Sequence, residues 1–117
     1  MLNIVLPWPP TMNTYWRNVA GRTLISERGR TFAHQVAGHV TLQRAAKAFK
    51  TRLDVRVFAF PPDKRKRDLD NLLKPLLDAL TKAGVWADDS QIDVLSITRG
   101  NSCAGGSVRV EVREIAR

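Results

Sequence analysis

The sequence has little of what marks a secreted or a membrane protein. Cys103 is its single cysteine, so the chain cannot form an internal disulfide, which fits the reducing cytoplasm. No stretch approaches the roughly 20 apolar residues that a membrane-spanning helix needs. The opening segment, MLNIVLPWPP, has no basic flank and reaches prolines early, unlike a signal peptide. We therefore predict a cytoplasmic protein with no membrane partner.

Acidic residues are also in short supply. Nineteen Lys and Arg face eleven Asp and Glu, which gives a net charge of +8 and an isoelectric point near 10.6. Such an excess favours a polyanionic partner, most often nucleic acid. Basicity that only keeps the protein soluble is the alternative, and charge alone does not separate the two. At 117 residues we expect one domain, spanning residues 1–117.

Hydrophobic periodicity predicts an α+β fold. Two helices are expected, from an N-cap at Ser26 to about Phe49 and from Asp68 to Ala83. A hairpin turns at Gly21, after a loop at residues 11–18. Strands are expected at residues 2–6, 52–60, 91–99 and 107–114, with a turn at 100–106. The economical architecture is one mixed sheet with two helices packed on it, in the order β-hairpin-α-β-α-β-β.

The loop at residues 11–18 combines amide, aromatic and cationic side chains. Asn13, Tyr15 and Arg17 are candidates for stacking on or clamping a nucleic acid. For Trp8 and Trp16 we favour a structural role, covering the edge of the core.

Three other reactive residues have plain interpretations. His34 and His39 lie five apart on a predicted helix, whereas metal ligands on a helix prefer a spacing of three or four. We therefore interpret them as surface or core-edge histidines. Cys103 is interpreted as a small residue in a turn rich in Gly and Ser.

The stretch KRKRDLDNLLKPLLDALTKAGVWADD, at residues 64–89, carries the main functional signal. Four cations open it, and Asp68 and Asp70 follow at once. Lys74 comes one helical turn after Asp70, and Asp88 and Asp89 close the stretch. The four cations are candidates for holding DNA phosphates. They are Lys64, Arg65, Lys66 and Arg67.

The start of this helix decides where its carboxylates point. We expect Asp68 as a non-helical cap and Asp70 in the first turn, so that both turn toward one point. Pro75 removes a helix hydrogen bond, which predicts either a kink at residues 71–74 or a late start with Pro75 in the first turn.

Chain lengths allow the distant acidic pair to return to these carboxylates. The helix would be about 24 Å long, and the segment after the stop at Gly84 spans roughly 17 Å when extended. With Trp86 packed on the helix, Asp88 or Asp89 would approach the level of Asp70. We therefore expect three carboxylates to converge.

Converging carboxylates beside cations suit the hydrolysis of a phosphodiester. Mg²⁺ held by carboxylates neutralises phosphate oxygens and generates the nucleophile, and a nearby Lys74 stabilises the transition state or orients the water. The alternative is structural: the acids would be helix caps and turn residues, and the basic run would be a solvated surface.

The motifs resemble those of the RusA Holliday junction resolvases. The resemblance rests on RDLDNL, on Lys74, on DALTKAG followed by Trp86 and Asp88-Asp89, and on LPWPP and the Asn13, Tyr15, Arg17 spacing. It covers nearly the whole chain, and the 100–106 turn is its weakest part. It implies a RusA-like fold and a homodimer that nicks four-way DNA junctions in symmetric pairs, in recombination and repair, encoded by a bacterium or a prophage.

The resemblance also implies a set of site residues. Asp68, Asp70 and Asp89 would be the essential acidic residues that hold Mg²⁺, with Asp88 as a neighbour and Mn²⁺ as an alternative ion. Lys74 would be the essential lysine. Two other functions stay open: a non-catalytic DNA-binding module and a metal nuclease for other branched DNA.

Overall fold

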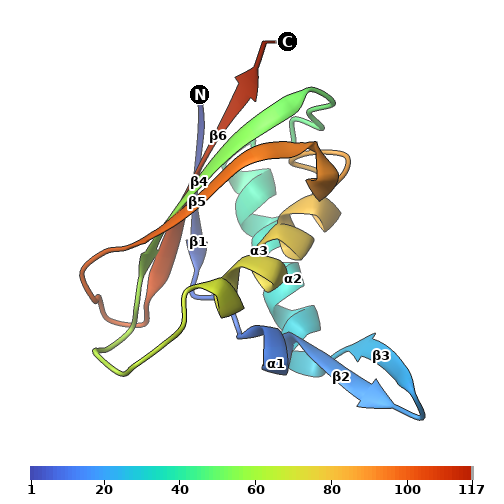
Figure 1. Cartoon of the computed structure of the whole chain (residues 1–117), viewed down its shortest axis with the longest axis vertical. Helices are drawn as coiled ribbons and strands as arrows, with labels where there is room; N and C mark the ends of the chain where they lie inside the picture. Colours follow the sequence, from blue (N-terminus) through green and yellow to red (C-terminus); the bar gives the residue numbers. More distant parts are fainter. Residues whose placement is uncertain (117) are drawn as a thin grey trace.

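The computed structural model describes residues 1–116 and contains one four-stranded mixed sheet (Figure 1). Its strand order is β1-β6-β4-β5, with β4 parallel to β5 and antiparallel to β6, and β1 antiparallel to β6. These strands are β1 (Leu2–Pro7), β4 (Arg52–Phe60), β5 (Ile92–Arg99) and β6 (Ser107–Ile115). All four were predicted, those at 52–60 and 107–114 from alternating apolar residues, and the predicted α+β class is confirmed.

Two helices cover one face of this sheet, as predicted. They are α2 (Glu27–Leu42) and α3 (Asp70–Lys82) (Figure 1). Alternate residues of β4 point toward them and are fully buried, because period-two alternation puts one set of side chains on the helix-covered face. No helix in the described part of the chain is long and apolar enough to cross a membrane.

The helix α2 starts as predicted and ends earlier. The Ser26 side chain caps it by accepting a hydrogen bond from the amide of Gly29 at 3.0 Å. The helix stops at Leu42 instead of near Phe49, because Arg44 adopts a left-handed backbone with φ of 55°. The amide of Ala45 then bonds back to Val40, and Ala45 is buried. The sequence has no glycine at this point, so it lacks the usual signal for the end of a helix.

The segment between β1 and α2 is more ordered than predicted. The expected loop at residues 11–18 contains α1 (Met12–Tyr15) and β2 (Trp16–Val19), and β2 pairs with β3 (Arg22–Ile25) as a separate hairpin. Ala20 and Gly21 both have positive φ, as a two-residue hairpin turn requires. Figure 1 shows this hairpin projecting from the body of the molecule beside the start of α2.

A close contact fixes α1 against the first turn of α2. The Ser26 hydroxyl donates to the Thr14 carbonyl at 2.6 Å, and the Ser26 amide donates to the Tyr15 carbonyl at 2.9 Å. Gly29 is buried at this contact, where a Cβ atom would lie 2.3 Å from the Tyr15 carbonyl oxygen. The approach of α1 therefore requires glycine at position 29.

Two glycines of α2 give a matched test of this contact. We expect Gly29→Ala to lower the free energy of unfolding by about 1–3 kcal/mol through overpacking. Gly38, in the same helix, has open space where an added methyl group would lie, so Gly38→Ala should raise it by about 0.5–1 kcal/mol. Urea denaturation followed by circular dichroism measures both, and equal effects of the two substitutions would contradict the contact.

Candidate functional site

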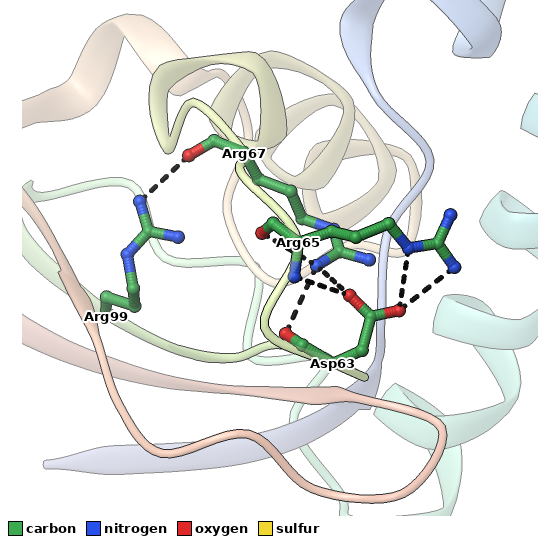
Figure 2. A network of polar contacts seen from close by, with 4 residues as sticks. All are labelled: Asp63, Arg65, Arg67 and Arg99. Atoms are coloured by element: carbon green, nitrogen blue, oxygen red, sulfur yellow. Dashed lines mark hydrogen bonds and ion pairs between the residues drawn. The ribbon is translucent and has the colours of Figure 1, made fainter.

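The predicted DNA-binding cations lie on the loop between β4 and α3. Asp63 organises this loop, and its carboxylate accepts hydrogen bonds from the Arg65 amide at 2.9 Å and from Arg67 Nη1 at 2.7 Å. Arg65 also forms an ion pair with Asp63 at 3.1 Å (Figure 2). These two arginines hold the pKa of Asp63 well below its ordinary value, Arg67 having the largest effect.

The four cations therefore differ in their availability to DNA. Arg67 points inward, with 21% of its side chain exposed, and its guanidinium lies 5.8 Å from the centre of the Trp8 ring. Arg65 is 83% exposed even though it pairs with Asp63. Lys64 and Lys66 are exposed and make no hydrogen bond or ion pair with any residue that the structure describes.

Arg99 is a member of this cluster that the sequence did not reveal. It stands at the end of β5, and its Nη2 donates to the Arg67 carbonyl at 2.9 Å (Figure 2). Thirty-two residues separate the two along the chain. Asp63 was missed as well, although a carboxylate directly before four cations is a signal that the sequence does offer.

The first acidic pair and Lys74 lie at the start of α3, next to the cations. Asp70 is the first residue of the helix, as expected for a carboxylate near the positive end of the dipole. The predicted cap at Asp68 is wrong: Leu69 holds the cap position and no side chain caps the helix. Asp68, Asp70 and Lys74 are all exposed.

Pro75 lies inside α3, beyond its first turn, so the predicted late start of the helix is wrong. Proline at this position leaves the Asn71 carbonyl without its helical amide partner. The Pro75 ring is buried among the apolar residues of α3, which recur at helical spacing as predicted. Packing of this face on the sheet thus offsets the lost hydrogen bond.

The second acidic pair is held on a short turn before β5. Trp86 is buried and its Nε1 donates to Thr81 Oγ1 at 2.6 Å, so it packs on α3 as predicted. Asp88 caps the 3-10 turn η1 (Asp89–Gln91) by accepting a hydrogen bond from the Ser90 amide, which lowers the pKa of Asp88. Asp89, in contrast, is not the capping residue.

The turn η1 is fixed by a buried glutamine. The Gln91 side chain donates to the carbonyls of Phe49 and Thr51, at 2.9 and 2.8 Å, and accepts from the Asp88 amide at 2.8 Å. These three hydrogen bonds satisfy a buried amide, and the two to Phe49 and Thr51 tie η1 to the chain just before β4. Gln91 therefore fixes the turn that carries Asp89, and the sequence pattern did not single it out.

The two acidic pairs do not converge within the chain. No three side chains of Asp, Glu, His or Cys in residues 1–116 form a group that could hold a metal ion. After Gly84 the chain does not run back along α3 but lies beside residues 48–50, with the Phe49 amide donating to the Val85 carbonyl. Asp70 follows the carboxyl end of β4, whereas Asp89 precedes the amino end of the parallel β5. The two residues therefore lie toward opposite ends of these strands (Figure 1).

The candidate residues near the amino terminus separate into two kinds. Asn13 and Arg17 are exposed on α1 and β2 and stay available to a ligand. Tyr15 has no exposed surface, and its hydroxyl donates to Asp78 Oδ2 on α3 at 2.6 Å. Because the ring is buried, the predicted DNA contact by Tyr15 is not supported. Trp8 and Trp16 pack against the core, as predicted.

The remaining reactive side chains agree with their plain interpretations. His34 and His39 are exposed on α2. Cys103 is exposed in the turn between β5 and β6.

Comparison with known proteins points to one family. The family described as Endodeoxyribonuclease RusA matches residues 7–113. A crossover junction endodeoxyribonuclease of Enterobacteria phage HK97 is 40% identical over 111 residues, 95% of this chain and 92% of that protein. Proteins of the same name from Escherichia coli K12 and Enterobacteria phage 82 are 36% and 37% identical over 113 residues, 97% of this chain and 94% of each of those proteins.

The contact between Tyr15 and Asp78 makes a prediction about stability. Burial, together with the hydrogen bond to Asp78, raises the pKa of Tyr15 above its ordinary value of 10.0. We expect Tyr15→Phe to lower the free energy of unfolding by about 1.5–3 kcal/mol near neutral pH, measured by urea denaturation. In the parent protein this contribution is complete below pH 10 and lost as the pH rises above it, because the unfolded chain then releases a proton that the folded protein retains.

Tyr15 is the only tyrosine, so ultraviolet absorbance reports its ionisation directly. Tyrosinate absorbance that develops near pH 10 while circular dichroism still shows the folded protein would contradict the buried hydrogen bond.

Proposed function

The chain belongs to the RusA family of endodeoxyribonucleases, and from this membership we propose that it cuts four-way DNA junctions. The observation that carries the proposal is the adjacency of a cationic loop to exposed carboxylates at the start of α3. Cations there hold the DNA backbone, and carboxylates act on a phosphodiester next to it. The relatives from two phages and from Escherichia coli are named crossover junction endodeoxyribonucleases.

The finer parts of the proposal follow from the chemistry of a junction. A four-way junction is resolved by two nicks placed symmetrically, which completes recombination or a repair event. Two phage proteins among the relatives support a prophage origin for this chain. Two copies of the chain would act together on the junction, because a two-fold substrate suits a two-fold enzyme.

Asp68 and Asp70 are the carboxylates that we propose as metal ligands. Mg²⁺ is usually held by one or two carboxylates together with water and substrate phosphates, so this exposed pair is a sufficient donor set. Mn²⁺, which prefers the same oxygen donors, is the alternative ion. The ion, when bound, would supply charge neutralisation and an activated water. Asp89 is proposed as a further essential carboxylate from the family resemblance, with Asp88 as its neighbour.

Lys74 and the cationic loop have distinct proposed roles. Lys74 is exposed one turn along α3 from Asp70, where its ammonium group stabilises negative charge that develops on the phosphate. Lys64 and Lys66 extend into solvent and contact flanking phosphates. Asn13 and Arg17 add contacts from α1 and the hairpin, and Figure 1 shows the hairpin and the 61–69 loop on opposite sides of the lower half of the molecule, with the start of α3 between them.

Two other functions fit part of the same surface. A non-catalytic DNA-binding module would use the cations and leave the carboxylates as structural residues. A nuclease for flaps or other branched DNA would use the same carboxylates on a different substrate. Cleavage assays with a four-way junction, a flap and a linear duplex distinguish these three functions.

The first prediction of the proposal concerns catalysis. We expect Asp70→Asn to reduce Mg²⁺-dependent cleavage of a synthetic four-way junction by about 100-fold or more, because it removes a charged metal ligand. Asp89→Asn should also reduce cleavage, because the family resemblance implies that Asp89 is an essential carboxylate. Glu114→Gln makes the same chemical change at an exposed position on β6 and should cleave like the parent. An Asp70→Asn protein that cuts as fast as the parent would refute the assignment.

The second prediction concerns assembly. β5 is an edge strand, and it exposes Val94 and Leu95, with 43% and 42% of their surface accessible. An unpaired edge that carries apolar side chains favours association with another copy. We expect analytical ultracentrifugation at micromolar protein to give twice the 13.1 kDa mass of the chain.

A pair of variants locates the interface of this dimer. Leu95→Lys should yield monomers, whereas Leu42→Lys, at an 82% exposed position on α2, should stay dimeric. Monomeric parent protein would contradict the dimer, and a dimeric Leu95→Lys would exclude β5 as its interface.

A further inference from the structure

A basic pocket lies where the two parallel strands end. β4 and β5 run in the same direction, so the 61–67 loop and the 100–106 turn leave the sheet at the same edge (Figure 1). Between them is a pocket of about 490 Å³. It is lined by Pro61, Asp63, Lys64, Arg65, Arg99, Gly100, Asn101 and Ser102. The amino end of α3, with Asp68 and Asp70, follows the same loop.

The charge of this pocket selects an anion. The lining residues include three cations, Lys64, Arg65 and Arg99, and one carboxylate, Asp63, which gives the lining a net charge of +2. The Asp63 carboxylate is occupied by Arg65 and Arg67, so little of its acceptor capacity remains for a cation from solution. Pockets of roughly 300–1,000 Å³ hold small molecules, so the volume admits a phosphate together with its sugar.

Backbone hydrogen bonds make the two walls of the pocket one unit. The Gly100 amide donates to the Ala59 carbonyl at 2.8 Å, and the Cys103 amide donates to the Pro61 carbonyl at 2.9 Å. Gly100 packs so closely on Phe60 that a Cβ atom would lie 2.4 Å from the ring. The turn therefore stands at a fixed distance from the loop, as a preformed binding site requires.

We propose that this pocket binds a DNA backbone phosphate next to the cleaved one, with Arg99 and the turn at residues 100–102 as its second wall. The inference rests on the proposed junction nuclease and adds a contact from β5 that the basic run alone does not provide. Arg99 is suited to it because one Nη group holds the Arg67 carbonyl, which leaves the remaining guanidinium donors for an anion. Arg99 thus links the phosphate to the loop that leads to Asp68.

The test measures junction binding without cleavage, by fluorescence anisotropy in the absence of divalent ions and across a range of salt concentrations. Arg99→Gln should weaken binding about tenfold at low salt and reduce the slope of log affinity against log salt by about one, as for one lost phosphate contact. Arg99→Lys keeps the charge and should keep most of the slope. Arg113→Gln, at an exposed site on β6, should bind like the parent.

A second variant tests the pocket while leaving the hydrogen bond between Arg99 and Arg67 intact. Asn101→Asp places a negative charge in the pocket and should weaken binding with no loss of thermal stability, whereas Asn3→Asp on β1 should have no effect. An unchanged salt slope for both Arg99→Gln and Asn101→Asp would overturn the pocket. A parent protein that binds and cuts junctions while these variants match it would refute the pocket alone, and a parent that neither binds nor cuts would refute the proposed function as well.

Discussion

The parallel pairing of β4 with β5, bridged by α3, is the constraint that positions the candidate site. Parallel neighbours need a crossover, and α3 supplies it while burying one face on the sheet. The crossover brings the end of β4, the start of α3 and the end of β5 to one edge of the sheet. At this edge the chain places its cationic loop, its first acidic pair and the turn that carries Arg99.

Most of the positive charge at this edge of the sheet remains available to bind an anion. Asp63 accepts a hydrogen bond from Arg67, which lies against Trp8, and forms an ion pair with Arg65. These contacts fix the conformation of the loop. Lys64 and Lys66, by contrast, extend into solvent. One carboxylate thus organises two arginines, and the loop as a whole remains strongly positive. The exposed Asp68 and Asp70 follow directly in the chain, so the region has both cations that can bind phosphate and oxygen donors for a hard cation.

The second acidic pair shows how packing overrides a reasonable geometric expectation. Extended chain of the available length is able to return along α3, and the burial of Trp86 agrees with that path. The chain instead pairs with residues 48–50, because backbone groups next to a buried strand need partners and Gln91 adds hydrogen bonds to the carbonyls of Phe49 and Thr51. Asp89 is consequently held in a defined place, but at the opposite end of the parallel strands from Asp70.

Local periodicity and short motifs such as RDLDNL were enough to predict the strands, the two helices, the class of fold and the family. They also indicated which residues are candidates for the chemistry. Three features emerged only once the elements were packed: Tyr15 is a buried anchor for Asp78, Arg67 points inward, and Arg99 joins the cationic loop across 32 residues. Burial, side-chain direction and contacts between distant segments depend on how the elements pack, and local residue patterns do not specify that packing.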